Sequence, residues 1–74
     1  MYDKDIILEM VEGLEENGEI RMTDGLREIY IQSFDEDGEV IYVSNNNKEF
    51  EEAEDAIQWA INQFGGVENI EEWE

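Results

Sequence analysis

Apolar residues recur at helical spacing in two segments of the chain. The stripe in residues 3–17 consists of Ile6, Ile7, Met10, Val11 and Leu14. The second stripe consists of Phe50, Ala53, Ile57, Ala60, Ile61 and Phe64. Asn46 and Glu49 stand before it at the spacing of a capping box, and Gly65 follows it. We therefore expect a helix at 3–17 and a second helix that follows Asn46 and runs to about Phe64.

Between these stripes, apolar and polar residues alternate as they do in half-buried strands. The alternation predicts three antiparallel strands, at Glu19–Thr23, about Leu26–Phe34 and about Glu39–Ser44. Asp24-Gly25 is typical of a two-residue hairpin turn, and a second turn is expected at Asp35-Glu36-Asp37-Gly38. The alternation does not decide which face of the third strand is buried.

The last segment, 67–74, places Val67, Ile70 and Trp73 three residues apart, which predicts one or two further helical turns. The expected order is helix, three-stranded antiparallel meander, helix and short C-terminal helix, an α+β fold that makes residues 1–74 a single domain. Each long helix has one apolar stripe, so we expect both to cover the same face of the sheet. The other face would be exposed or would face a partner.

The chain carries a strong net negative charge that its fold does not require. The 74 residues include 22 Asp and Glu but four Lys and Arg, for a net charge of −18. Several like-charged pairs stand four residues apart on the expected helices, such as Glu12 with Glu16 and Glu51 with Asp55, and each costs about 0.2–0.5 kcal/mol. Because net charge governs association rather than architecture, we expect a binding partner to use it.

Several kinds of chemistry are excluded by composition. Without Cys or His the chain offers no disulfide and none of the usual zinc or copper ligand sets. Ser33 and Ser44 have no His partner, and no phosphate-binding glycine motif is present, so we expect neither an enzyme nor a cofactor. The Asp35–Gly38 segment resembles part of a calcium loop, but Ser44 stands where the bidentate Glu is needed, so no metal site is expected.

Two further partners are disfavoured by the sequence. No apolar run approaches a membrane span, and no signal peptide is recognisable at the start of the chain, so we expect no membrane association. Direct binding of nucleic acid is also not expected. The four basic residues, which cannot offset the repulsion, are Lys4, Arg21, Arg27 and Lys48.

The acidic residues fall into four clusters: on the first helix, in the second turn, at the start of the second helix and in the tail. Neighbouring carboxylates on helices and strands lie about 5–7 Å apart, so a folded acidic surface approximates a row of DNA phosphates coarsely. Such a surface attracts a groove lined by Arg and Lys. The alternative interpretation is an acidic protein whose charges are simply solvated.

The order of elements also resembles a known family, the small phage anti-CRISPR proteins that inhibit Cas9 by imitating PAM-bearing DNA. It is most like a Listeria prophage inhibitor with a helix, a three-stranded sheet and C-terminal helices. The matching segments are Asp5–Met10, Ile29-Tyr30-Ile31, the Asp37-Gly38 hairpin, the strand that ends at Ser44, and Glu71-Glu72-Trp73.

The resemblance implies a stoichiometric inhibitor in the cytoplasm of the bacterial host. Its acidic hairpin and tail would occupy the PAM-reading cleft of Cas9 and block target DNA. The partner-binding residues implied in this way are Asp35, Glu36, Asp37, Gly38, Glu39, Glu68, Glu71 and Glu72. The chain departs from the family at Val40, where an acid is expected, and at Gly65-Gly66, where the family has a bulkier junction.

These departures leave the identity of the partner open. A multi-subunit CRISPR complex or a restriction enzyme also has a basic DNA channel, and an acidic antitoxin for one basic protein is a further possibility. A different alternative is an interaction module that binds through apolar contacts and uses its charge for solubility. Tyr30, Phe34 or Tyr42 on an exposed sheet face would favour that alternative.

Overall fold

Both long helices form around the apolar stripes of the sequence. In the computed structural model, which describes residues 3–74, helix α1 spans Asp3–Asn17, as expected, and helix α2 spans Ala53–Phe64. Met10 and Leu14 of α1 are fully buried. Ile6, which we expected in the same stripe, is 38% exposed instead.

Helix α2 begins later than the capping-box spacing predicted. Residues Glu49–Phe50 form a short strand, β4, which pairs with Tyr42 and Val43. Asn46 does not cap the helix, because its side-chain oxygen accepts a hydrogen bond from the Ser44 hydroxyl. Strand pairing satisfies backbone groups here that a helix N-terminus would leave without partners. The cap position is taken by Glu52, with no side-chain hydrogen bond.

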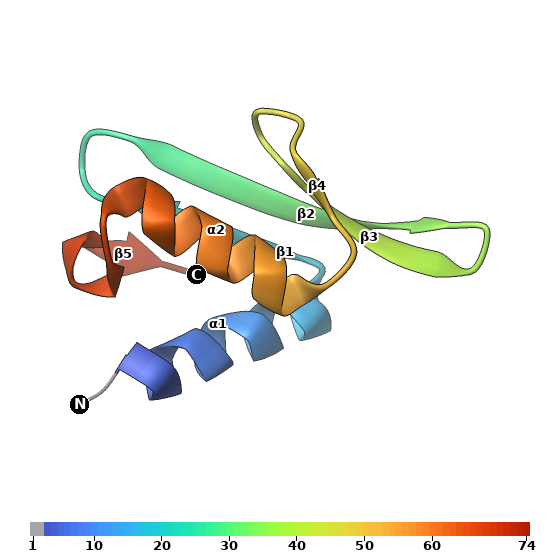
Figure 1. Ribbon diagram of the computed structural model, residues 1–74, viewed down its shortest axis with the longest axis horizontal. Helices are drawn as coiled ribbons and strands as arrows, with labels where there is room; N and C mark the ends of the chain where they lie inside the picture. Colours follow the sequence, from blue (N-terminus) through green and yellow to red (C-terminus); the bar gives the residue numbers. More distant parts are fainter. Residues whose placement is uncertain (1–2) are drawn as a thin grey trace.

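The sheet contains the expected meander and two further strands at its edges. Strands β1 (Glu19–Thr23), β2 (Glu28–Glu36) and β3 (Glu39–Ser44) are antiparallel neighbours in chain order. The full order is β4-β3-β2-β1-β5, in which β5 is Glu72–Trp73. The fold is therefore α+β with a five-stranded sheet (Figure 1).

The loop between β1 and β2 is longer than the predicted two-residue turn. Thr23 pairs with Glu28, so four residues connect the strands. The Asp24 carboxylate accepts hydrogen bonds from the backbone N–H groups of Leu26 and Arg27, at 2.9 and 2.8 Å, and this arrangement holds the wider loop. β2 consequently starts after Leu26, whose side chain is 94% exposed.

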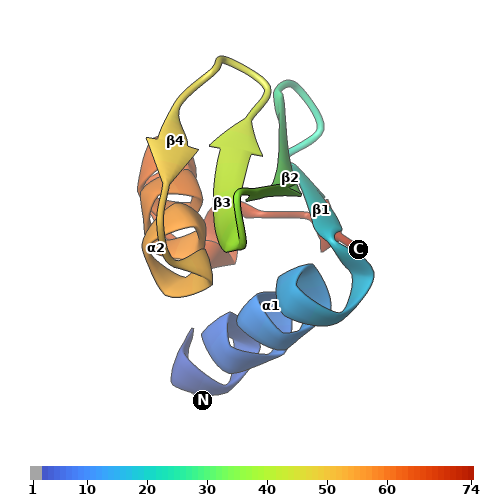
Figure 2. The same ribbon diagram turned by 90° about the vertical axis from the view of Figure 1, so that its right-hand side faces the viewer.

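One face of the sheet carries the core, and both helices cover it, as expected. Its buried residues are Ile20, Met22, Ile29, Ile31, Tyr42 and Ser44. The sheet curves around the two helices, which also contact each other (Figure 2). Buried side chains of α2 complete the core: Ala53, Ala56, Ile57, Ala60, Ile61 and Phe64. Phe50, predicted on this helical stripe, instead packs from β4 against Trp59, with ring centroids 5.5 Å apart.

The tail also differs from the predicted helical turns. A single 3-10 turn, η1, spans Val67–Asn69, and the chain then runs alongside β1 as β5. Trp73 lies opposite Met22, and its ring points toward α1 at Gly13. Backbone hydrogen bonds between Arg21 and Glu74, 2.9 and 3.0 Å long, extend the pairing to the last residue.

The far end of the β2–β3 hairpin extends beyond the helices. We call residues 34–41 the finger; residues 34–40 are all exposed (Figure 1). Its tip is a two-residue turn in which Asp37 and Gly38 both have positive φ, 53° and 86°. This is the combination of a type I′ turn, for which Asp-Gly is a favoured sequence. The finger makes the molecule long, with extents of 37 × 24 × 17 Å.

Candidate functional site

The finger holds the first group of sequence-predicted site residues together. Asp35, Glu36, Asp37 and Glu39 are all exposed within one tight hairpin. β2 continues to Glu36 and β3 starts at Glu39, so these acids stand on two paired strands rather than on a loose loop. The ribbon fixes the directions of their side chains, because successive residues of a strand point to opposite faces.

Two of these carboxylates oppose each other directly across the ribbon. The register places Glu36 opposite Glu39, next to the turn. Like charges at directly opposed positions of an antiparallel pair are destabilising. In the described part of the chain, neither glutamate forms an ion pair. The local sequence therefore concentrates negative charge where the stability of the hairpin is better served without it.

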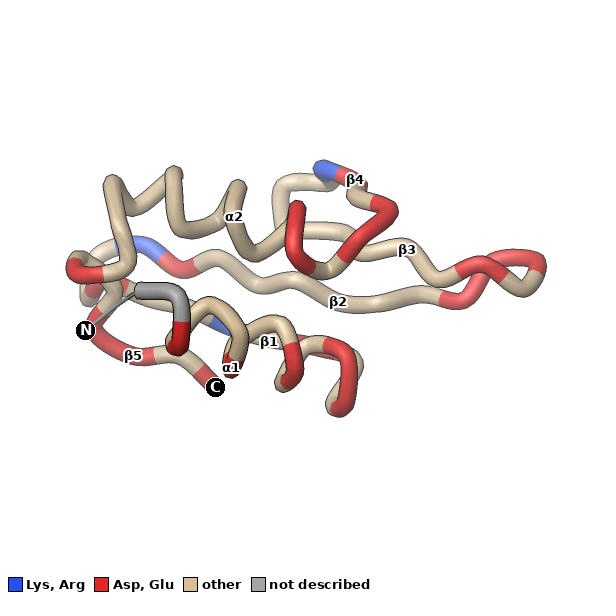
Figure 3. The backbone as a smooth tube through the Cα atoms, turned by 60° about the horizontal axis from the view of Figure 1, so that its bottom comes forward, with Lys and Arg blue, Asp and Glu red and all other residues tan. Residues whose placement is uncertain are grey.

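A second group of acids, not predicted as part of the site, lies near the base of the finger. Glu15 of α1 lines a shallow hollow together with Glu51 and Glu52, which precede α2, and Glu54 in its first turn. We call these four residues the acidic shelf. Val40 of the finger borders the same hollow, so the shelf lies near the base of the finger, and uncharged segments of β2 and β3 separate it from the acidic tip (Figure 3).

No local feature of the sequence indicates this grouping of the acidic shelf. Glu15 and Glu51 are far apart in the chain, and they share a hollow because α1 and α2 pack side by side on the sheet. Their clusters were visible as charge runs, but a charge run is also typical of a solvated helix face. Predicting that Glu15 and Glu51 share a surface would have required knowing that α1 and α2 are in contact.

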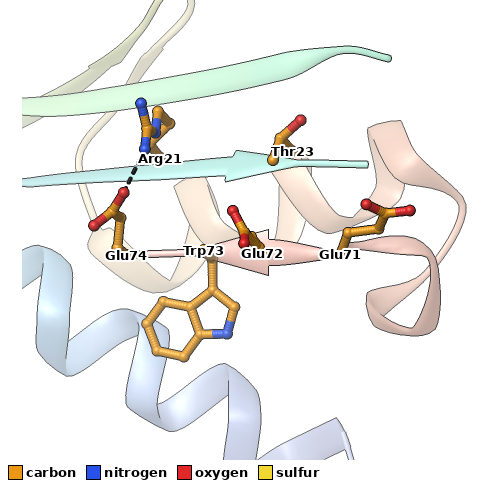
Figure 4. A pocket seen from close by; sticks show the side chains of 6 residues that line it. All are labelled: Arg21, Thr23, Glu71, Glu72, Trp73 and Glu74. Carbon is orange, nitrogen blue, oxygen red and sulfur yellow. Dashed lines mark hydrogen bonds and ion pairs between the residues drawn. The ribbon is translucent and has the colours of Figure 1, made fainter. Parts of the chain in front are cut away.

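The predicted tail residues lie elsewhere. Glu68, Glu71 and Glu72 occupy the opposite end of the long axis from the finger, so the structure does not bring the two predicted clusters together (Figure 3). The two clusters are separated because β5 pairs with β1 and fixes the tail there. Glu71 lies beside Gly25 of the β1–β2 loop, while Glu72 and Glu74 line a hollow with Arg21 and Thr23 (Figure 4).

Positive charge is confined to the end of the molecule that lacks the finger and to the turn before β4. The Arg21 guanidinium pairs with Glu28 at 3.2 Å and with Glu74. Arg27 lies 4.0 Å from the carboxylate of Asp24 and stacks over the Phe64 ring. Among the described tail acids, Glu74 is thus neutralised, whereas Glu68, Glu71 and Glu72 form no ion pair. Among the described side chains, no Lys or Arg forms an ion pair with an acid of the finger or the shelf.

Three groups have pKa values displaced by their surroundings. Backbone N–H groups of Arg27 and Leu26 lower the pKa of Asp24, consistent with its role in holding the loop. The hydrogen bond from the Tyr30 hydroxyl to Glu19 raises the pKa of Tyr30. Burial, assisted by the nearby charge of Glu15, raises the pKa of Tyr42. These shifts describe local structure.

The outer face of the hairpin is apolar next to the acidic tip. Four side chains form this outer strip: Tyr30, Phe34, Ile41 and Val43. Phe34 lies opposite Ile41 and is 47% exposed. Of the three aromatic residues considered for an exposed sheet face, Tyr30 and Phe34 lie there. Tyr42 does not, because it is 8% exposed and belongs to the core.

Three observations on the described residues concern metals, membranes and known proteins. No group of three or more Asp or Glu side chains is arranged to hold a metal ion. Residues 3–74 include no helix with the length and apolar character required to traverse a bilayer. Comparisons of the chain with protein-family models, with curated proteins and with solved structures found no match.

Proposed function

We propose that this protein is a stoichiometric inhibitor that presents an imitation of DNA to the basic groove of a nucleic-acid-binding protein. The favoured partner is a bacterial CRISPR effector of the Cas9 type, met in the cytoplasm of the bacterial host. The observation that carries the proposal is the finger. Its four exposed carboxylates stand on a paired hairpin, and none of the described Lys or Arg side chains forms an ion pair with them, although Glu36 and Glu39 repel each other.

The proposed mechanism is occupation of the groove without turnover. Arginines that bind guanine edges or phosphates are forked donors, and carboxylates accept the same pairs of hydrogen bonds. The finger is a two-stranded ribbon whose strands lie about 4.8 Å apart, so it is slim enough to enter a cleft that reads DNA. The acidic shelf would then face the basic rim of the groove and accelerate encounter.

The structure changes which residues we propose for this role. The finger acids Asp35, Glu36, Asp37 and Glu39 remain, with Gly38 shaping the turn. Shelf residues join them because they lie near the base of the finger. The tail acids Glu68, Glu71 and Glu72 would contact the same partner only if its groove ran the length of the protein, so we assign them a minor role.

The test is displacement of DNA from a purified Cas9–guide RNA complex by two matched variants. The finger variant carries Asp35→Asn, Glu36→Gln and Glu39→Gln. The tail variant carries Glu68→Gln, Glu71→Gln and Glu72→Gln. Each removes three negative charges from the net −18, so a difference between them reports position rather than total charge. Asp37 is kept because it occupies the left-handed turn position.

We expect the finger variant to lose at least about tenfold in inhibition, since charge-assisted hydrogen bonds at an interface are worth about 2–5 kcal/mol when truncated. The tail variant should stay within about threefold of the unmodified protein. Equal losses in both variants would contradict a local role for the finger. Failure of the unmodified protein to displace DNA would reject this effector as the partner, and a restriction enzyme would be the next candidate to assay.

A further inference from the structure

The outer strip lies directly beside the acidic tip of the finger. Along the ribbon, the pair Glu36–Glu39 is followed on the same face by Phe34–Ile41 and then by Gln32–Val43. Tyr30 continues the strip along β2. Apolar side chains bordered by charged ones are the usual composition of an interface, with an apolar centre and a polar rim. The contact surface therefore does not end with the carboxylates.

A hollow on this face is shaped by two aromatic rings. It is lined by Tyr30, Gln32, Phe34, Val43, Ser44, Asn45 and Asn47. The Tyr30 ring is held in place because its hydroxyl donates to Glu19 and accepts a hydrogen bond from Gln32 at 3.3 Å. The Asn45 side chain is held by the carbonyl of Glu28 at 3.1 Å. The floor and wall of the hollow are thus ordered before any partner arrives.

Two aromatic rings outside the outer strip have a cation of the protein over them. The Arg27 guanidinium lies 5.2 Å from the centre of the Phe64 ring, and the Lys48 ammonium lies 5.5 Å from that of Phe50. In the part of the chain that the structure describes, no Lys or Arg lies over the ring of Tyr30 or Phe34. Arg21, the cross-strand neighbour of Tyr30, is directed to Glu28 and Glu74.

We propose that the outer strip docks an arginine side chain presented by the partner. The aliphatic stem would lie along Val43 beside Tyr30, and the guanidinium would stack on the Phe34 ring next to the Glu36–Glu39 pair. The inference rests on the proposed function in one respect, which is that the partner is basic. It adds a second contact of different chemistry, on the outer face rather than at the tip.

Charge complementarity decides between the possible occupants of the strip. A second copy of this chain would bring another charge of −18 against the carboxylates Glu36 and Glu39, so self-association is opposed. A purely apolar partner would leave those carboxylates without counterions beside the contact, so it would make no use of the charge there. An arginine satisfies both parts of the surface, because its flat guanidinium stacks on rings and pairs with carboxylates.

The first test uses a defined probe, the peptide acetyl-Gly-Arg-Gly-amide, titrated into the isotope-labelled protein at 0.5 M NaCl. We expect amide chemical-shift changes concentrated at residues 30–34 and 41–45, and at least about twofold larger than with the matched Lys peptide. Salt at this level suppresses diffuse attraction to the acidic clusters. Changes spread over all acidic segments, or equal effects of the Lys peptide, would overturn the inference.

Two substitutions supply the controls. Phe34→Ser should reduce the peptide-induced shifts at least about threefold, whereas Leu26→Ser, at a more exposed apolar site outside the strip, should leave them unchanged. Both sites are exposed, so both variants are expected to fold. If Phe34→Ser binds the peptide as the unmodified protein does, the strip is not the docking site.

The same substitutions in the Cas9 displacement assay separate the two proposals. We expect Phe34→Ser to weaken inhibition about tenfold and Leu26→Ser to leave it unchanged. Normal inhibition by Phe34→Ser beside a failed finger variant would overturn the outer strip and keep the proposed function. Lack of inhibition by any form, beside a positive peptide titration, would keep the strip and reject the effector.

Discussion

Two glycines of this protein, Gly13 and Gly38, differ in how much the fold depends on them. Gly13 stands inside α1, where glycine is a poor helix former. A Cβ atom added there would lie 3.9 Å from the Trp73 ring, an ordinary van der Waals distance. Gly38, by contrast, has open space around it but a φ of +86°. The backbone conformation therefore requires glycine at position 38, whereas position 13 has room for an alanine side chain.

Gly13→Ala should raise the free energy of unfolding by about 0.5–1 kcal/mol, since the helix loses its most flexible residue without a clash. Urea denaturation followed by circular dichroism measures the change. Gly38→Ala is the matched control, and it should lower stability by about 1 kcal/mol because alanine strains at positive φ. A destabilising Gly13→Ala would mean that the helix and Trp73 pack more tightly than the structure has them.

Individual elements show what could be predicted from sequence. β1 and β3 match their predicted bounds because alternation and the Asp37-Gly38 turn act locally. α2 was predicted to start near Asn46 because a capping-box spacing is also local, but pairing of Glu49–Phe50 with β3 prevails there. The strand character of the tail has no local signal at all. It arises from contact with β1, roughly fifty residues earlier.

The same reasoning applies to the arrangement of the candidate site. The finger acids were predicted correctly as one exposed turn, because residues 35–39 are adjacent in sequence. Their proximity to the shelf and their separation from the tail depend on how α1, α2 and β5 pack. Sequence adjacency therefore defined the members of each cluster, whereas tertiary packing decided which clusters share a surface.

The tail provides an element-scale prediction, because Trp73 is the β5 side chain that packs against the core. Trp73→Ala should lower the free energy of unfolding by about 2 kcal/mol, below the value for a fully buried Trp because this ring is half-buried. Thermal or urea unfolding measures the loss. Glu72→Gln changes the exposed neighbour on the opposite face and should stay within about 0.5 kcal/mol. Equal stability of Trp73→Ala and the unmodified protein would show that β5 is not a structural strand.

At the scale of the whole molecule, the charge of −18 acts on folding and on binding with opposite signs. The protein is 37 Å in its longest extent, so at about 0.01 M salt, where the screening length is about 30 Å, nearly all its carboxylates repel one another. At about 1 M salt the screening length falls to about 3 Å. Added salt should therefore raise the free energy of unfolding, whereas it should lower the affinity for a basic groove.

We expect NaCl raised from about 0.01 to 0.5 M to increase the melting temperature by several degrees, since about 1 kcal/mol corresponds to about 4–8 °C in a domain of this size. Over the same range, affinity for a basic partner should fall at least about tenfold. Chloride is preferred to sulfate, because sulfate also strengthens apolar burial. The finger variant, with three charges fewer, should gain less from salt. A melting temperature that does not respond to NaCl would show that self-repulsion is not a significant cost to this fold, and affinity that does not respond would show that the carboxylates are not what the partner binds.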